Sequence, residues 1–327
     1  MKILLIGATG QVGYALTHAL VQAGHDTTVL VRSAGRLAFP AGVQVVTEAN
    51  FTQEGFERLL PQVDCAVYGI GLPEQFTFDA GIFEAVNLNL LKTFLAAMEK
   101  SSLRRLVYVS TYEVFAAQGG MIRESHPQAS LAGLTPYFTA MTQAYTEATT
   151  FAARTGTALT TIHPAAVYGG LNTSEGFTNV IENLLNWRLW KLPVVLPGQF
   201  PLVHAQSLAA AIVSAIKLGQ TGPFIVSDGM CSLKSLAQAL RTLTHSYVPP
   251  QVPAGLAYAS TAPLEALGRA VHFRPMLCKV QLDFITAGNE PLATRAAQKL
   301  DWKRLPLKDG LQRYLADRAQ LLAAKSA

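Results

Sequence analysis

Three glycines near the start of the chain constrain its fold more than any other feature. Gly7, Gly10 and Gly13 lie between an apolar run, residues 2–6, and a segment whose apolar residues recur with helical spacing. A strand that turns this tightly into a helix needs residues without a Cβ atom, and the N–H groups at the helix N-terminus attract phosphate. This order of strand, glycine-rich turn and helix is typical of a dinucleotide-binding site.

The end of the second predicted strand indicates which dinucleotide is bound. A carboxylate at this place binds the ribose 2′-hydroxyl of NAD, whereas an arginine accommodates the 2′-phosphate of NADP. The strand ends at Val31 and is followed by Arg32, while Asp26 stands at its beginning. The sequence therefore favours NADP(H) over NAD(H).

Apolar runs alternate with helix-like segments through the first half of the chain. The predicted strands are residues 2–6, 27–31, 43–46, 65–68, 105–109 and 159–162. The segments between them carry apolar residues at intervals of three and four, as helices do. We therefore predict an α/β protein with a Rossmann-type doubly wound parallel sheet, whose strands are joined by crossover helices.

The pattern loosens beyond Gly169 and Gly170. Later in the chain we predict helices over 208–218, over 233–242 and after Asp309, a strand over 224–226, and a proline-rich stretch over 249–263. We assign residues 1–169 to a Rossmann domain that also takes elements from about 203–228. Residues 170–202 and 229–327 form a smaller, mixed C-terminal substrate-binding lobe in this prediction.

The composition excludes several classes of protein. Half of the residues (50%) are hydrophobic and the basic residues are spread along the chain, so neither disorder nor a nucleic-acid surface is indicated. No apolar run reaches the ~18 residues of a membrane span, and no signal peptide is recognised. Cys65, Cys231 and Cys278 lack the spacing of a metal site or a disulfide framework. We expect a soluble, cytoplasmic protein with buried free thiols, a small-molecule substrate and no metal.

Further motifs resemble those of the extended short-chain dehydrogenase/reductase family, the NAD-dependent epimerase/dehydratase group. In chain order they are the glycine turn, Val86-Asn87, Ser110-Thr111, Pro136-Tyr137, His163-Pro164, Val167-Tyr168-Gly169 and Leu300-Asp301-Trp302, so the resemblance runs nearly end to end. The resemblance implies a cofactor pocket formed by Gly7, Thr9, Gly10, Gln11, Val12, Gly13 and Arg32, by Asn50 and Phe51 near the adenine, by Gly69, Ile70 and Gly71 near the riboses, and by Tyr137 and Pro164, with Pro164 near the nicotinamide.

The catalytic residues of the family are a Ser or Thr, a Tyr, and a Lys four residues after the Tyr. Thr111 and Tyr137 match the first two, but Met141 stands in the position of the lysine. A tyrosine has a pKa of about 10, and a thioether has no charge with which to lower it. Two residues are candidates to compensate for the missing lysine. One is Glu113, since a glutamate near this position has acid/base function in dehydratase members, and the other is His163, since imidazole titrates near neutral pH. Both residue types also occur in purely structural roles.

Two functions remain open at this point. The first is an NAD(P)-dependent oxidoreductase or epimerase/dehydratase that acts on a small carbonyl or alcohol compound; the second is a catalytically weak or inactive NADP(H)-binding sensor. Ala166 replaces an asparagine that often holds nucleotide sugars in the family, which disfavours such a substrate. The aromatic residues Phe76, Phe78, Trp187 and Trp190 are predicted to lie in the core, or else to line a site for an apolar substrate. Relatives often dimerise through the helices that correspond to 81–100 and 137–154, so a homodimer is expected.

Overall fold

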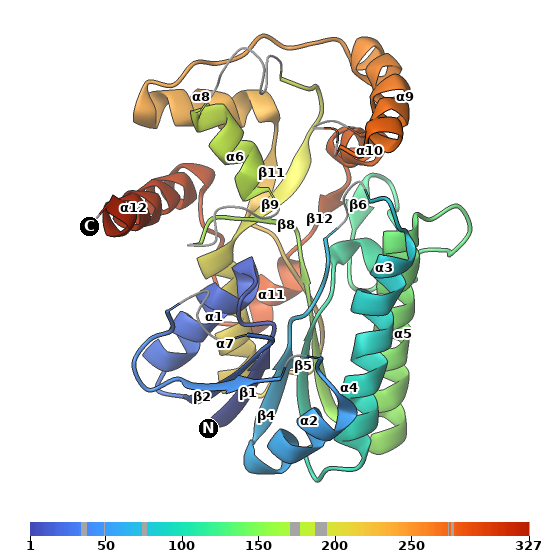
Figure 1. Ribbon diagram of the computed structural model, residues 1–327, viewed down its shortest axis with the longest axis vertical. Coiled ribbons are helices and arrows are strands. Elements are labelled where there is room, and N and C mark those ends of the chain that lie inside the picture. The colour runs from blue at the N-terminus through green and yellow to red at the C-terminus, as the bar shows by residue number, and fades with distance from the viewer. Residues whose placement is uncertain are drawn as a thin grey trace.

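The larger part of the molecule is built on one sheet of parallel strands (Figure 1). The computed structural model describes residues 1–33, 38–48, 50–73, 77–170, 177–186, 195–273, 275 and 278–326, with residues 321–326 described in their backbone alone. The strands are β1 (Lys2–Ile6), β2 (Asp26–Val31), β3 (Gln44–Thr47), β4 (Cys65–Tyr68), β5 (Arg105–Val109), β7 (Ala158–Pro164) and β10 (Gly222–Val226), in the order β10-β7-β5-β4-β1-β2-β3. Every pairing in this sheet is parallel, which confirms the predicted doubly wound architecture.

Two layers of helices cover the two faces of the sheet (Figure 1). One layer contains α1 (Gln11–Gln22), α7 (Ala205–Lys217) and α11 (Thr294–Lys299), and the other contains α2 (Gln53–Leu59), α4 (Leu90–Glu99) and α5 (Pro136–Thr155). Successive strand residues alternate between the two cores. In β1, Ile3 and Leu5 pack toward α1, whereas Leu4 and Ile6 pack toward α4. Both faces are therefore buried, which explains why the strands have continuous apolar sequences.

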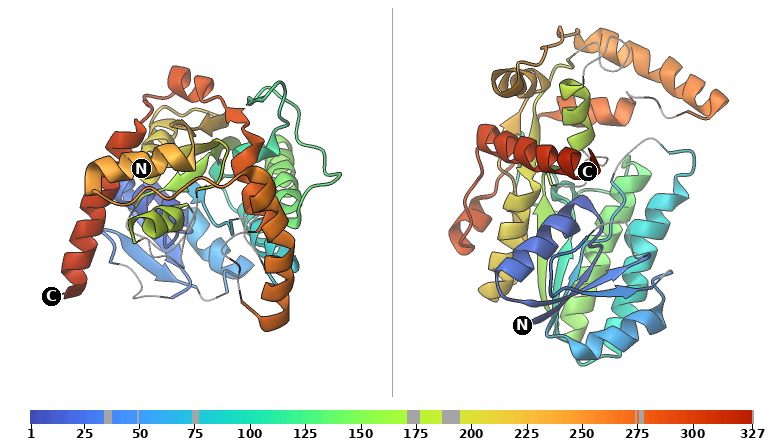
Figure 2. Two further views of the ribbon diagram at one scale, coloured as in Figure 1. Left: turned by 90° about the horizontal axis from the view of Figure 1, so that it is seen from above. Right: turned by 60° about the vertical axis from the view of Figure 1, so that its left-hand side comes forward.

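A second, mixed sheet lies beyond the carboxyl ends of the large sheet (Figures 1 and 2). It consists of β8 (Ala166–Tyr168), β9 (Phe200–His204) and β11 (Gly229–Cys231), with β9 parallel to β8 and antiparallel to β11. Its apolar core is shared with α6 (Thr178–Leu185), α8 (Leu233–Thr244), α10 (Lys279–Ala287) and α12 (Leu307–Ser326). Glu182 of α6 accepts hydrogen bonds from Tyr314 and from Arg318, the latter at 2.6 Å, and these bonds hold α12 beside α6.

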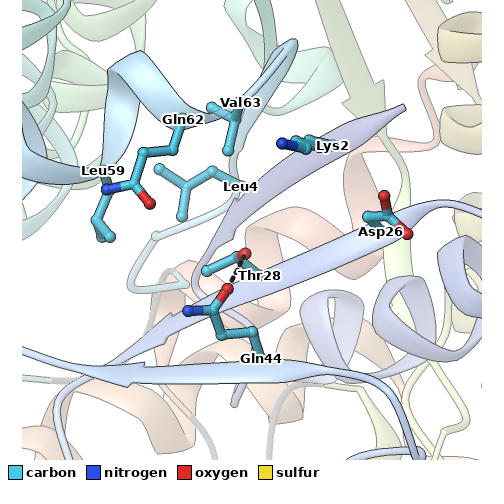
Figure 3. A pocket seen from close by; sticks show the side chains of 8 residues that line it. All are labelled: Lys2, Leu4, Asp26, Thr28, Gln44, Leu59, Gln62 and Val63. Atoms are coloured by element: carbon cyan, nitrogen blue, oxygen red, sulfur yellow. Dashed lines mark hydrogen bonds between the residues drawn. The ribbon is translucent and has the colours of Figure 1, made fainter.

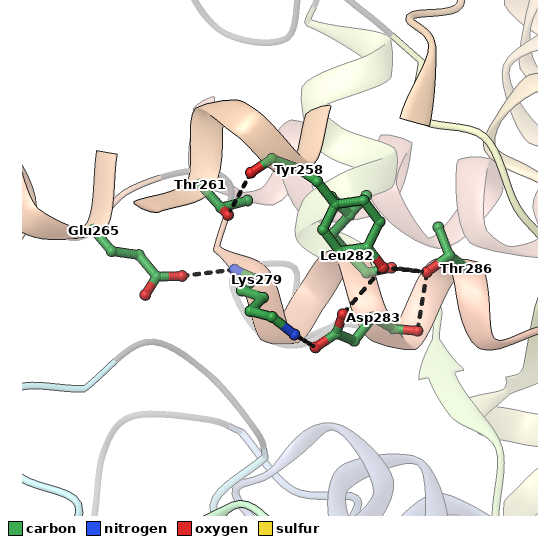
Figure 4. Close-up of polar contacts among 7 residues, drawn as sticks. All are labelled: Tyr258, Thr261, Glu265, Lys279, Leu282, Asp283 and Thr286. Atoms are coloured by element: carbon green, nitrogen blue, oxygen red, sulfur yellow. Dashed lines mark hydrogen bonds and ion pairs between the residues drawn. The ribbon is translucent and has the colours of Figure 1, made fainter. Parts of the chain in front are cut away.

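A long helix, α9 (Ala254–Val271), begins within the predicted proline-rich stretch and continues beyond it, with Pro263 inside the helix. Proline lacks the N–H group that would bond to the carbonyl of Ala259, and both residues are exposed, so water can reach that carbonyl. Helix α10 holds α9 in place through the Tyr258 hydroxyl, which donates to Asp283 at 3.0 Å, and through Glu265, which accepts from the Lys279 N–H at 2.6 Å (Figure 4). Tertiary contacts therefore override the local preference against a helix.

The remaining short elements lie between the two sheets and near the ends of strands. They are η1 (Leu60–Gln62), α3 (Gly81–Phe83), the π-helix η2 (Glu84–Asn89), the 3-10 turn η3 (Tyr112–Val114), and β6 (Met121–Ile122), which pairs with β12 (Glu290–Pro291). Among the helices of the described ranges, none has both the length and the hydropathy that a bilayer-spanning segment requires. Cys65, Cys231 and Cys278 are free and buried, as predicted.

Candidate functional site

Five neighbouring strands of the large sheet bring the predicted site residues to one edge. Gly7 follows β1, Arg32 follows β2, Gly69 follows β4, Thr111 lies just after β5, and Pro164 ends β7. Because these strands are parallel, their carboxyl ends meet at the same edge of the sheet, where ligands of such folds bind. The sequence motifs thus converge in space.

The glycine turn is tightly packed against the loop after β4. Gly7 has a positive φ of 93°, and a Cβ atom on it would lie 2.7 Å from the carbonyl carbon of Gly69. A Cβ atom on Gly13 would lie 2.1 Å from the carbonyl oxygen of Gly7. These two glycines are therefore required by the packing of the protein itself.

Gly10 differs from the other two glycines of the turn. Its φ of −75° suits any residue, and a Cβ atom there would meet only the Gly7 carbonyl oxygen, at an ordinary 3.5 Å. Gly10 is the N-cap of α1 and has no side chain with which to cap the helix. A side chain at Gly10 would instead fill the space in front of the helix N-terminus, where a pyrophosphate would lie, so the turn fits a dinucleotide.

Gln11, in contrast, directs its side chain away from this turn, toward the segment after β8 and the start of α6. Its Nε2 atom donates to the carbonyl of Gly169 at 2.7 Å and to the hydroxyl of Thr178, which also accepts from the Gly169 N–H at 3.1 Å. A cofactor would thus meet the backbone of Gln11 rather than its amide. Thr178 was not predicted from the sequence, because it lies 167 residues from Gln11.

The predicted adenine side of the pocket lies after β2 and β3. Arg32 and Asn50 are exposed, and no hydrogen bond or ion pair joins Arg32 to another residue of the described ranges. Phe51 is buried, stacks on Phe56 with ring centroids 6.2 Å apart, and has a φ of 48° in the left-handed region. A bulky residue in this region is strained and is held there by its packing.

Asn87 holds the loop that contains Gly69, Ile70 and Gly71. Its side-chain oxygen accepts from the Leu72 N–H at 2.6 Å, and its side-chain nitrogen donates to the Leu72 carbonyl at 3.0 Å. Asn87 is buried in the π-helix η2, a type of helix that is frequent at functional sites. The sequence motif Val86-Asn87 located this residue but did not indicate its partner.

Thr111 and Glu113 form the polar pair nearest the end of β5. The Thr111 hydroxyl donates to Oε2 of Glu113 at 3.1 Å, within the turn that also contains Tyr112. Glu113 is half-buried and acts on the neighbouring Tyr112 hydroxyl. Burial, followed by the nearby Glu113, raises the pKa of Tyr112 well above its ordinary value, so this hydroxyl stays protonated.

Tyr137 lies in the first turn of α5 with aromatic neighbours. Phe83 and Phe138 are T-shaped to its ring, with centroids 5.7 and 5.0 Å away. One helical turn further on, Met141 is 6% exposed and packs with Tyr112 and Tyr145 in an apolar cluster on which Tyr137 also rests. Met141 thus lies inside a hydrophobic core, as expected for a methionine.

His163 is fully buried and has both ring nitrogens engaged. Nδ1 lies 2.9 Å from the Thr111 carbonyl oxygen, and Nε2 lies 2.8 Å from the Thr161 hydroxyl. Burial lowers the pKa of His163 to about 4, so the ring is neutral at neutral pH. Of the two interpretations of this histidine, the hydrogen-bonded structural one agrees with the geometry.

Among the predicted aromatic residues, Phe76, Trp187 and Trp190 lie outside the described residues. Phe78 is 45% exposed and stacks on His272 with ring centroids 5.4 Å apart, so its assignment to the core is wrong.

A shallow pocket of about 180 Å³ lies at the opposite edge of the large sheet (Figure 3). The first residues of β1, β2 and β3 line it, which places it away from the glycine turn.

Comparisons with known proteins agree on the fold. A family model described as the NAD dependent epimerase/dehydratase family matches residues 3–226. The chain is similar to a nucleoside-diphosphate-sugar epimerase from Pseudomonas aeruginosa, with a TM-score of 0.79 and 20% identity over 98% of both chains. It is also similar to a UDP-glucuronic acid 4-epimerase from Bacillus cereus in complex with NAD, with a TM-score of 0.73 and 14% identity over 98% of this chain and 97% of the other.

A plant reductase is similar over a shorter region. An isoflavone reductase homolog from Solanum tuberosum is 35% identical over 101 residues, which cover 27% of this chain and 32% of the relative. The alignment thus spans about a third of the length of that relative.

Proposed function

Because the chain belongs to the NAD dependent epimerase/dehydratase family, we propose that it is an NAD(P)-dependent oxidoreductase that acts on a small alcohol or carbonyl compound. The hydrogen bond from Thr111 to Glu113 carries this proposal, since it places a proton acceptor beside the hydroxyl that matches the family's catalytic Ser or Thr.

The cofactor is proposed to lie along the carboxyl edge of the large sheet. The open space at Gly10 and the N–H groups of α1 would hold the pyrophosphate, and the exposed guanidinium of Arg32 would bind the 2′-phosphate of NADP. When bound, the nicotinamide supplies hydride exchange with the substrate carbon. Pro164 and the loop of Gly69 to Gly71 would flank the ring and the riboses.

Proton transfer is proposed to pass through Thr111. The hydroxyl of Thr111 donates to Glu113, so its oxygen can accept a hydrogen bond from a substrate alcohol. As the substrate O–H bond breaks, its proton passes to Thr111, and the proton of Thr111 passes to the Glu113 carboxylate. Reduction of a carbonyl compound uses the same path in reverse. Tyr137 is proposed to hydrogen-bond the same substrate oxygen from α5.

The substrate is proposed to be uncharged and largely apolar. Tyr137 is flanked by Phe83 and Phe138, and the nearby Ile82 is 40% exposed. Ala166 offers no amide where many relatives have an asparagine. Aromatic and aliphatic surface of this kind suits an aromatic or aliphatic alcohol better than a sugar diphosphate.

A second candidate function rests on Met141. Its thioether, buried in an apolar cluster, has no charge with which to lower the pKa of Tyr137. A protein that binds NADP(H) without turnover, and signals its binding to a partner, would tolerate this change. The two candidates predict the same binding and differ only in turnover.

Calorimetric titration with NADPH and NADH, followed by a turnover screen over aldehydes, ketones and alcohols, tests the proposal. We expect NADPH to bind more tightly than NADH, and Arg32→Ala to weaken NADPH binding by about 10- to 100-fold through the loss of a charge-assisted contact. Turnover with at least one compound supports the enzyme, whereas binding without turnover over the whole panel supports the sensor. Binding of neither nucleotide would overturn both.

A further inference from the structure

The buried histidine at the end of β7 lies directly behind the turn that contains Thr111 and Glu113. β7 is the neighbour of β5 in the sheet, and the Ser110 N–H donates to the Ile162 carbonyl at 2.8 Å. His163 is 0% exposed, and its ring lies between Phe115 and Tyr145, with centroids 4.7 and 5.1 Å away. The ring therefore cannot turn without disturbing both neighbours.

The partners of His163 determine which of its nitrogens is protonated. A carbonyl oxygen can only accept, so Nδ1 must donate its hydrogen to Thr111. In a neutral imidazole Nε2 is then an acceptor, and the Thr161 hydroxyl must donate to it. The hydrogen bonds therefore run in one direction, from Thr161 to His163 and from His163 to the Thr111 carbonyl.

This arrangement fixes the backbone of Thr111 through its carbonyl. Thr111 is buried and extended, with a φ of −136° and a ψ of 152°, and it precedes the turn of residues 112–114. Without His163 the Thr111 carbonyl would keep only the hydrogen bond that it accepts as N-cap of the turn of residues 112–114, and the peptide would be free to rotate about this one bond. Such a rotation would carry the Thr111 hydroxyl away from Glu113.

We propose that His163 is a positioning residue that fixes the Thr111 hydroxyl against Glu113 through the Thr111 backbone. The proposal rests on the proposed function, because it assigns to His163 an effect on turnover through Thr111. His163 does not touch the substrate in this role and carries no proton to it.

Two substitutions separate the hydrogen bond from the packing. His163→Asn keeps an N–H donor at the place of Nδ1 but leaves a cavity, whereas His163→Leu fills the space and donates nothing. A merely structural residue would make the better-packed leucine variant the more active one. We expect the opposite order: His163→Leu lowers kcat by about 10- to 100-fold with KM and NADPH affinity nearly unchanged, and His163→Asn stays within about threefold of the wild type.

Two measurements test the anchor without a substrate. Imidazole ¹⁵N–¹H spectra should show the Nδ1–H form of His163 in the wild-type protein. Amide hydrogen exchange of residues 111–114 should accelerate in His163→Leu but not in His163→Asn. An Nε2–H ring, or equal exchange and equal kcat in the two folded variants, would overturn the proposal. If the wild type turned over no compound, the proposed function and the catalytic role of His163 would fall together, while the spectra and exchange rates would still decide whether it anchors the turn.

Discussion

The glycines of the first turn have the same side chain but different reasons for it. Gly13 is enclosed by the backbone of Gly7 and Ala8, whereas Gly10 faces the open end of helix α1. The first is needed for folding, and the second is proposed to leave room for a ligand. This distinction cannot be made from the spacing of the glycines, because it depends on which backbone atoms approach each position.

Alanine substitutions at Gly13 and Gly10 should therefore act on different properties. Gly13→Ala should reduce the free energy of unfolding by about 3 kcal/mol or more, because the new Cβ atom overlaps the Gly7 carbonyl. Gly10→Ala should cost about 1 kcal/mol or less, yet weaken NADPH binding by about tenfold or more, because the methyl group occupies the phosphate site. Urea unfolding and calorimetry measure the two effects. Equal stability loss in both variants, or undiminished NADPH affinity in Gly10→Ala, would contradict the account.

The sequence singled out Thr111, Tyr137 and Met141 by their positions in motifs, and their functional roles stay predictions. The engagement of both nitrogens of His163 could not be predicted, because Thr111 lies 52 residues before it. The same holds for Asn87, whose partner Leu72 is 15 residues away. Motifs predict which residues come together, and the folded structure determines which of their atoms are already occupied.

At the scale of single elements, the start of helix α7 shows how a missing cap is replaced. Ser207 directly precedes the helix predicted over 208–218, and serine is a common N-cap residue. The helix begins earlier, however, and His204 caps it by accepting from the Gln206 N–H at 3.2 Å. Ser207 instead donates to Asp228, which also accepts from the backbone N–H groups of His204 and Leu305, each at 2.8 Å. A carboxylate from after β10 therefore joins β9, α7 and the segment before α12.

Asp228→Asn tests this junction. Both carboxylate oxygens of Asp228 accept hydrogen bonds from donors. The asparagine amide replaces one of these oxygens by an NH₂ group in either orientation, so at least one donor loses its acceptor. We expect the free energy of unfolding to fall by about 2 to 3 kcal/mol in urea titrations. The exposed Asp301→Asn is the matched control and should change it by less than about 0.5 kcal/mol. Equal stability of the two variants would show that Asp228 does not hold the junction.

At the scale of the whole molecule, the strands of the large sheet were predictable, whereas in the second lobe the sequence predicted helices α8 and α12 but not α9 or α10. Each strand of the large sheet is a short apolar run bounded by turns, so β1, β4 and β5 have the predicted bounds. In the second lobe the chain returns from distant segments, and helix α9 forms despite Pro263 because α10 supports it. The local sequence pattern predicts secondary structure poorly where the elements are stabilised by contacts between segments that are far apart in the sequence.

Two buried histidines make the stability of the whole molecule depend on pH. Burial lowers the pKa of His163 and of His204 to about 4. The unfolded chain takes up these protons near pH 6.5, so it binds more protons than the folded chain between about pH 6.5 and 4. Above pH 6.5 the two neutral histidines therefore do not reduce the free energy of unfolding. As the pH falls from 6.5 toward 4, each histidine lowers the free energy of unfolding by about 3 kcal/mol.

Urea unfolding of the wild type and of His163→Asn at several pH values measures this effect. The substitution removes one titrating group, so the loss of stability between pH 6.5 and 4 should be smaller by about 3 kcal/mol in the variant. Parallel pH profiles of the two proteins would mean that His163 titrates alike in the folded and the unfolded chain.

The most direct test of the central claim is the rate of NADPH oxidation by Glu113→Gln, with the best compound of the turnover screen. Glutamine keeps the size of the side chain but has no carboxylic acid proton to pass to Thr111 as the carbonyl compound is reduced. The account predicts that kcat falls by about 10²- to 10⁴-fold while NADPH affinity is unchanged. The control Glu147→Gln, at a side chain that is 45% exposed, should have no effect. An unchanged kcat in Glu113→Gln would contradict the assignment of proton transfer to Thr111 and Glu113.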